Sequence, residues 1–306
     1  MTDVRKLPLD RGLAWFLRGV NTGRRNPKAV FGASVLLIFT LYVVSFLLLL
    51  PIAWSDSDSS GAVPKLDIRL VMPFFLVLIG VFPVLMGGLM HVIREVEASR
   101  PVRARDLFTP ARSGGLKNLL LLGLVQLAFN LAAAALVLAL AGSGYWSEYL
   151  AAIHGAMSGS IPVMPEPAHP FLMFVVNVLF NYVSGVILLM AIPLILFSGA
   201  NLGESLKLSL RTARMNLAPN LTAAALYMLA VLASALVVSV VGAVLGSVLA
   251  LIHPLLGMLT LLVLYLAFGT AVLAVMAACA HAAWSDVFES IDKEKERTVA
   301  SARFEA

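Results

Sequence analysis

The sequence has few charged residues and a single cysteine, and these two shortages exclude several classes of protein. Aspartate, glutamate, lysine and arginine make up 13% of the 306 residues, against about 25% in a typical soluble domain. With Cys279 as its only cysteine, the chain cannot form an internal disulfide or a thiolate metal cluster. A chain with 60% hydrophobic residues and a mean hydropathy of +0.93 is expected to lie in a membrane.

Motifs that identify enzymes are absent as well. The chain contains no GxSxG, HExxH, CxxC or Walker sequence, and these are the local signatures of hydrolases, zinc proteases, redox proteins and nucleotide-binding loops. His154 and His169 accompany Glu148 and Glu166, but their spacing does not match that of two histidines that bind a metal from one helix. We therefore predict no enzyme activity, no catalytic residue, no metal site and no cofactor.

What the sequence has in abundance is long apolar segments. Six of them, each with at least the roughly 20 residues that cross a bilayer, lie at 29–52, 70–90, 118–141, 170–198, 217–250 and 255–283. As bounded here, none of them holds a charged residue. Backbone amides must be paired inside lipid, and the segments lack the alternation of barrel strands, so we predict helices. The predicted fold is an all-α integral membrane protein with six transmembrane helices arranged as three hairpins.

Basic residues predict the orientation. Of the 22 lysines and arginines, 20 lie before the first span, in the second and fourth connections or in the tail, and only Lys65 and Arg69 lie elsewhere. Because basic residues accumulate in cytoplasmic loops, we predict a bacterial inner-membrane protein with both termini in the cytoplasm. The first span is longer than the core of a cleavable signal peptide, so we expect it to be retained. His91 and His281, which end the second and sixth spans, are expected at headgroup level.

The predicted organisation has three parts. Residues 1–28 form a cytoplasmic amphipathic segment, residues 29–284 form the six-span domain, and residues 285–306 form a charged cytoplasmic tail. On the far side, residues 54–67 are expected to be a polar loop because turn-forming residues dominate there. Residues 146–157 carry apolar and aromatic side chains at helical spacing, which predicts an amphipathic helix in the outer interface.

A basic segment precedes each hairpin, at 11–25, 105–118 and 203–217. The first and third combine an apolar and a cationic stripe, which is typical of a helix at a membrane surface. The apolar stripe of the first consists of Leu13, Phe16, Leu17 and Val20. We predict that cations in and beside these two segments contact anionic lipid headgroups; they are Arg18, Arg24, Arg25, Lys28, Lys207, Arg211 and Arg214.

The first and third basic segments also resemble each other in sequence. A shift of 190 positions aligns them without gaps and places Thr22, Arg24 and Asn26 on Thr212, Arg214 and Asn216. A duplication would produce this match. The shared demands on any basic segment that leads into a span would produce it too, so both explanations stay open.

Two pairs of amides are the most polar residues inside the predicted spans. Gln126 and Asn130 lie four apart on the third span, and Asn177 and Asn181 lie four apart on the fourth. At 1.5 Å per residue, Asn130 and Asn181 should reach similar depths and could meet within a turn. They would then form a polar ligand site or a water-filled path, or they would join the helices by hydrogen bonds, which we consider the commoner case.

Four stretches carry a resemblance to known proteins. GLAWFLRGVNTGRRNP, DLFTPAR, LGESLKLSLRTARMNLAP and AACAHAAWSDVF resemble a family of uncharacterised six-span inner-membrane proteins of proteobacteria. They are more distantly similar to the membrane domain fused to some glycerophosphodiester phosphodiesterases. The resemblance implies a six-span membrane fold and brings no established catalytic residues. This chain has no soluble phosphodiesterase domain, so that enzyme activity is not implied.

Two hypotheses about function follow. In the first, the chain is a non-enzymatic inner-membrane protein that organises or assists lipids or partner membrane proteins. Its partners would be anionic lipids on the cytoplasmic face and a membrane protein or a second copy of the chain, because small residues such as Gly242 and Gly246 predict close helix packing. Nucleic acid is not expected. In the second, the chain is a channel or transporter for a small or amphiphilic solute, and one continuous cavity should then reach all four amides.

Overall fold

The structure is a computed structural model that describes residues 4–55, 68–112, 114–157 and 163–289. Helices make up 88% of this part of the chain, which contains no strand, and six of its helices are long and apolar enough to cross a membrane. The predicted all-α membrane fold is therefore confirmed. The helices are α1 (Asp10–Arg25), α2 (Pro27–Ser55), α3 (Ile68–Glu97), η2 (Ala104–Arg112), α4 (Leu116–Ala141), α5 (Tyr145–Met157), α6 (Pro170–Phe197), α7 (Leu202–Met215), α8 (Leu217–Ile252), α9 (Pro254–Trp284) and the π-helical turn η3 (Ser285–Glu289).

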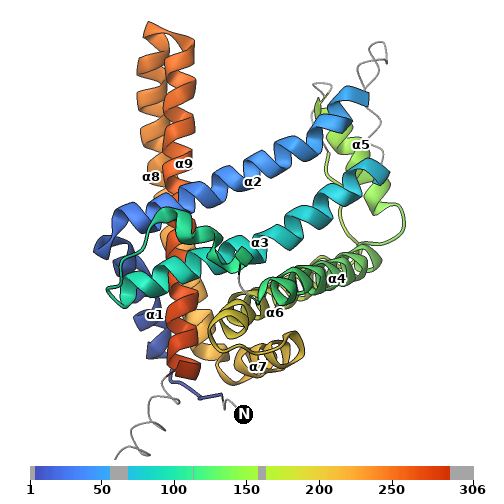
Figure 1. Cartoon of the computed structure of the whole chain (residues 1–306). Helices are drawn as coiled ribbons and strands as arrows, with labels where there is room; N and C mark the ends of the chain where they lie inside the picture. The colour runs from blue at the N-terminus through green and yellow to red at the C-terminus, as the bar shows by residue number, and fades with distance from the viewer. Residues whose placement is uncertain (1–3, 56–67, 113, 158–162, 290–306) are drawn as a thin grey trace, which may run out of the picture.

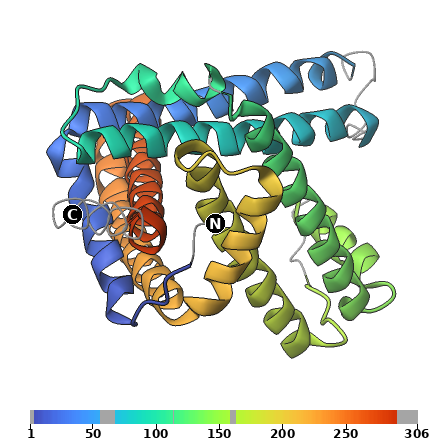
Figure 2. The same cartoon turned by 60° about the horizontal axis from the view of Figure 1, so that its bottom comes forward.

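The six long helices form three hairpins. In the first hairpin α2 packs on α3, in the second α4 packs on α6, and in the third α8 packs on α9. The three hairpins meet at one end and point in different directions from there, which is visible from both viewpoints (Figures 1 and 2). The arrangement is a splayed set of three pairs rather than one parallel bundle.

Short helices gather where the hairpins meet. The helix α1 packs against α8 and α9, η2 packs against α2 and α3, and α7 packs against α6. Each of the three basic segments is thus helical and precedes its hairpin, as the sequence predicts, although η2 is a 3-10 helix. We call this end of the molecule the basic end.

Single residues join some of the helices. Asn26 alone separates α1 from α2, and Asn216 alone separates α7 from α8. Pro27 opens α2, a position that suits proline because the first helical residue needs no N–H bond. At the tip of the third hairpin, the His253 side chain accepts a hydrogen bond from the Leu255 N–H and so caps α9.

The buried core lies at the basic end of every span. In α2 the buried residues end at Leu37, and in α3 they begin at Gly80. In α9 they begin at Thr270, apart from Gly257 near its tip. In a representative apolar stretch of α3, 61% of the residues are buried, against 6% in α4 and 11% in α8. Beyond the core, apolar side chains of α2, α8 and α9 are exposed over most of their length. The packing is therefore densest toward the basic end, although α3 and α4 also touch farther out, where a Cβ on Gly123 would collide with the Ile79 carbonyl oxygen.

The far side agrees with its prediction where the structure describes it. The helix α5 covers Tyr145–Met157 and adjoins α4. Trp146 stacks on Tyr149 with ring centroids 5.5 Å apart, and its side chain is exposed. The polar loop lies almost entirely in residues 56–67, which are outside the described residues, and so does the charged tail beyond residue 289.

Candidate functional site

The helix α1 carries two faces, and only one of them packs on protein. Gly12, Trp15, Gly19 and Thr22 are buried at helical spacing. A Cβ on Gly12 would collide with the carbonyl oxygen of Pro219 in α8, and one on Gly19 would collide with the thiol of Cys279 in α9. Only glycine allows α1 to lie this close to both helices of the third hairpin.

The opposite face of α1 is apolar and faces outward. Leu9, Leu13, Leu17 and Val20 are exposed, and three of these belong to the apolar stripe that the sequence predicts. An apolar face without protein contacts on a helix with arginines in its last turn suits a membrane surface.

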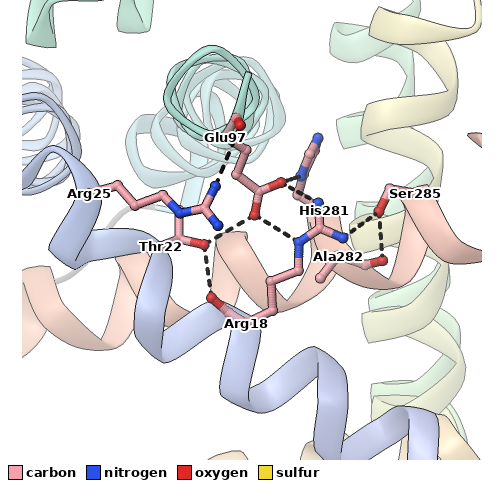
Figure 3. Close-up of polar contacts among 7 residues, drawn as sticks. All are labelled: Arg18, Thr22, Arg25, Glu97, His281, Ala282 and Ser285. Atoms are coloured by element: carbon pink, nitrogen blue, oxygen red, sulfur yellow. Dashed lines mark hydrogen bonds and ion pairs between the residues drawn. The ribbon is translucent and has the colours of Figure 1, made fainter. Parts of the chain in front are cut away.

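A cluster of polar side chains joins α1 to the first and third hairpins. Glu97, the last residue of α3, lies between Arg18 of α1 and His281 of α9 (Figure 3). Arg18 donates to both carboxylate oxygens, from Nε over 3.0 Å and from Nη2 over 2.5 Å. His281 Nδ1 lies 3.1 Å from Glu97 Oε2. We call Arg18, Thr22, Glu97, His281 and Ser285 the Glu97 cluster.

Further contacts complete the Glu97 cluster. The Thr22 hydroxyl lies 3.1 Å from Glu97 Oε1, and Arg18 Nη1 donates to the Ser285 hydroxyl over 3.1 Å. The Glu97 and His281 side chains are 9% and 4% exposed, whereas Arg18 is 45% exposed. A carboxylate this buried requires such partners, because an unpaired buried charge is strongly destabilising. His281, which the sequence analysis expects at headgroup level, has its side chain buried inside the protein; its depth in the membrane stays a prediction.

A second carboxylate joins α1 to η3, the turn that follows α9. Asp286 in η3 accepts hydrogen bonds from Arg11 Nε over 2.9 Å and from Trp15 Nε1 over 2.7 Å. The hydrogen bond to Asp286 raises the pKa of Arg11 above its ordinary value. Arg11 thus stays charged at any physiological pH, and α1 is joined to both α3 and η3 by ion pairs.

The two asparagines of the sequence repeat occupy equivalent places. Asn26 follows α1 and accepts from the Ala29 N–H, whereas Asn216 follows α7 and binds the N-terminal segment. The Asn216 side chain accepts from the Leu7 N–H and donates to the Arg5 carbonyl, both over 2.9 Å. The repeat therefore matches in helical arrangement, while the two side chains have different partners.

The predicted headgroup-contacting cations divide into two groups. Arg18 belongs to the Glu97 cluster, and Arg25 Nη1 lies 3.5 Å from the Glu97 carbonyl oxygen. The others are exposed at the basic end; they are Arg24, Lys28, Lys207, Arg211 and Arg214. Their contact with lipid stays a prediction.

The four predicted amides do not form one cluster. Gln126 donates to the Ser184 hydroxyl and so joins α4 to α6. Asn181 donates to the Asn177 carbonyl over 2.8 Å and to its side-chain oxygen over 2.5 Å, within α6. Asn130 is exposed, and among the described residues it forms no hydrogen bond with Asn181, so the expected meeting of these two residues is not seen.

The amides line two different cavities. Gln126 and Asn130 border a cavity of about 520 Å³ between α2, α3, α4 and α6. Asn181 borders another, of about 260 Å³, between α1, α6, α8 and α9. Asn181 lies near the basic end rather than beside Asn130, since its neighbour Tyr182 donates to the Ala213 carbonyl of α7 there. Counting residues along straight helices did not predict this position.

The site has no arrangement that resembles a catalytic or metal centre in the described part of the chain. No group of three histidine, cysteine, aspartate or glutamate side chains could hold a metal there. The contacts of the Glu97 cluster join helices and leave no activated nucleophile beside a base. Sequence reasoning missed this cluster because Glu97 and Ser285 lie just outside the predicted spans.

Comparisons with protein-family models, curated proteins and solved structures yield no match to this chain. The resemblance to six-span inner-membrane proteins and to phosphodiesterase membrane domains therefore stays a prediction.

Proposed function

We propose that the chain is a non-enzymatic integral membrane protein that organises lipids around its three hairpins. The observation that carries this proposal is that the buried core lies toward the basic end, while the far halves of α2, α8 and α9 expose apolar side chains. In a bilayer, acyl chains have to cover these surfaces and fill the spaces between the hairpins. Lipids would then lie in the spaces between the hairpins as well as around the protein.

The basic end supplies the polar half of this proposal. Four exposed cations lie there, Arg24 of α1, Lys28 of α2, and Lys207 and Arg214 of α7, and α1 also carries its outward apolar face at this end. Each cation near an anionic surface contributes about 1 kcal/mol to its attraction. We propose that this end faces the cytoplasm of a bacterium and gathers anionic lipids of the inner membrane, because basic residues favour that side.

Partner proteins would bind through surfaces other than the small-residue faces. Gly242 and Gly246 of α8 pack on Leu261 of α9, and Thr270 and Ala274 are buried within the chain. These residues therefore support close packing inside the protein, and a homodimer or a partner membrane protein would use the exposed apolar flanks.

The test is extraction of the full chain with its surrounding native lipids, followed by mass spectrometry of all lipids and proteins that co-purify. We expect an excess of anionic lipid over the bulk membrane. Substituting Gln at Arg24, Lys28, Lys207 and Arg214 should reduce that excess. The matched control substitutes Gln at Lys65 and Arg69, the cations predicted on the far side, and should retain it. A lipid composition equal to the bulk membrane would overturn the proposal.

Topology has its own measurement. A reporter that is active only outside the cytoplasm, fused after Glu305, should be inactive, whereas the same reporter inserted between Ser59 and Gly61 should be active. The reverse pattern would overturn the proposed orientation. The channel or transporter hypothesis stays a prediction, and the two cavities reached by different amides do not provide the single path that it expects.

A further inference from the structure

The smaller of the two cavities lies at the basic end, where the helices α1, α6, α8 and α9 surround it. Trp15 comes from α1, Met190 from α6, and Met276 from α9, while α8 closes the remaining side with Ala223 and other residues. At about 260 Å³ it falls just below the roughly 300–1,000 Å³ of pockets for drug-sized ligands. It has room for one chain or one ring and not for a whole phospholipid.

The chemistry of the walls favours an apolar occupant. Most lining side chains are apolar, and the two tyrosine hydroxyls already have partners. Tyr182 donates to the Ala213 carbonyl over 2.7 Å, and Tyr227 donates to the Val272 carbonyl over 3.1 Å. Two amides also line the cavity, Asn181 and Asn220. Asn181 already donates to Asn177, so Asn220 is the amide that suits the ester or carboxyl end of an amphiphile.

The cavity has a closed end and an open side. Trp15, Met190 and Ala280 are almost fully buried, so they form the inner wall. Asn181 of α6 and Ala224 of α8 are exposed, so the mouth lies between these two helices. Both helices belong to membrane spans, and the mouth therefore faces lipid.

We propose that this cavity binds a single acyl chain, which enters between α6 and α8 and ends against Trp15. This inference rests on the proposed function and names one lipid site within it. The amide of Asn220 holds the ester or carboxyl end, and the apolar walls replace the chain's contacts with other lipids. The chain belongs either to a membrane phospholipid or to a free fatty acid, since both offer the same group.

One glycine allows a clean test. Gly185 of α6 lines the cavity, and a Cβ added there meets nothing within 4 Å. Gly185→Leu should therefore fill the cavity without a clash, and leucine also favours a helix more than glycine does. Leu179→Phe is the matched control, because Leu179 lies on the same helix, is exposed and does not line the cavity.

The readout is the fluorescence of Trp15 in the full chain with Trp54, Trp146 and Trp284 changed to Phe. The protein is reconstituted either in vesicles of a phospholipid brominated in mid-chain, or in plain vesicles with added brominated fatty acid. Because Trp15 is buried from bulk lipid, we expect quenching that is lost in Gly185→Leu and kept in Leu179→Phe. Quenching in the first arm assigns the chain to phospholipid, and quenching in the second arm alone assigns it to fatty acid.

The outcomes separate the two proposals. No quenching in either arm, or equal quenching in Gly185→Leu and the parent, would overturn the acyl-chain site. Ala224→Leu at the mouth gives a second variant in case Gly185→Leu fails to fold. An excess of anionic lipid in the native extract would still support the proposed function after such a failure, because that excess depends on the exposed cations and not on this cavity.

Discussion

The Glu97 cluster gives a prediction that can be worked out in numbers. Glu97→Ala removes two charge-assisted hydrogen bonds from Arg18 and the contacts with Thr22 and His281. A hydrogen bond to a charged group contributes about 1.5–3 kcal/mol, and a buried polar group left without its partner costs about 1–3 kcal/mol. Arg18 is half exposed and can return to water, so its share is small. We expect Glu97→Ala to lower the free energy of unfolding by about 3 kcal/mol and Glu97→Gln, which keeps the shape and one acceptor oxygen, by about 2 kcal/mol.

The assay is unfolding in mixed micelles of mild detergent and increasing dodecyl sulfate, followed by tryptophan fluorescence, since Trp15 and Trp284 are both buried at the basic end. Glu95→Ala is the matched control. Glu95 lies on the same helix and pairs with Arg100, whose side chain is exposed and whose Nη1 lies 3.3 Å from Glu95 Oε1. Such an exposed pair contributes at most about 1 kcal/mol. Equal losses in Glu97→Ala and Glu95→Ala would refute the reasoning. So would a double-mutant cycle of Glu97→Gln with Arg18→Gln that gave no coupling.

Three further predictions use the same unfolding assay. Gly19→Ala should lower the free energy of unfolding by about 1–3 kcal/mol, because its Cβ would overlap the Cys279 thiol. Adding Cys279→Ala should restore part of that free energy, and no restoration would mean that this overlap is not the cause. Asn216→Ala should cost about 1–3 kcal/mol and speed amide exchange at Leu7, whose N–H it binds, while Asn26→Ala should leave that exchange unchanged. Arg11→Gln should lower the free energy of unfolding by the same amount at every physiological pH, since the raised pKa keeps the arginine charged throughout that range; a pH-dependent loss would contradict this.

The sequence predicts the membrane helices well because hydropathy is a long, additive signal. The predicted span 118–141 is α4 to within two residues, and 217–250 is α8 to within two residues. The helix α3 is the informative difference, because it continues to Glu97 whereas the predicted span ends at residue 90. Charges in the last turns of a span are invisible to a hydropathy boundary, and the Glu97 cluster is built from such turns.

Residues without a hydropathy signal account for most of what the sequence could not predict. Gly12 and Gly19 are the points where α1 touches the third hairpin, yet a pair of glycines seven residues apart reads only as weak helix. The apolar stripe of α1 was predicted correctly as a stripe, but nothing in the pattern says that its opposite face, centred on Trp15, is the one that packs on protein. The placement of the amides in two cavities also depends on helix tilt, which periodicity does not contain.

The splayed arrangement has a physical cause in the distribution of small and polar residues. In lipid, leucine and valine gain little by packing on another helix, because acyl chains solvate them equally well. Helices associate where backbones come close or polar groups pair, and these contacts concentrate at the basic end, at Gly19, Gly88, Glu97 and Asp286. Farther out, Gly246 against Gly257 holds α8 to α9, and Gly123 against the Ile79 carbonyl oxygen holds α4 to α3. In the proposed function lipid fills the spaces between the hairpins, and the proposed acyl-chain site lies at the basic end, between the second and third hairpins.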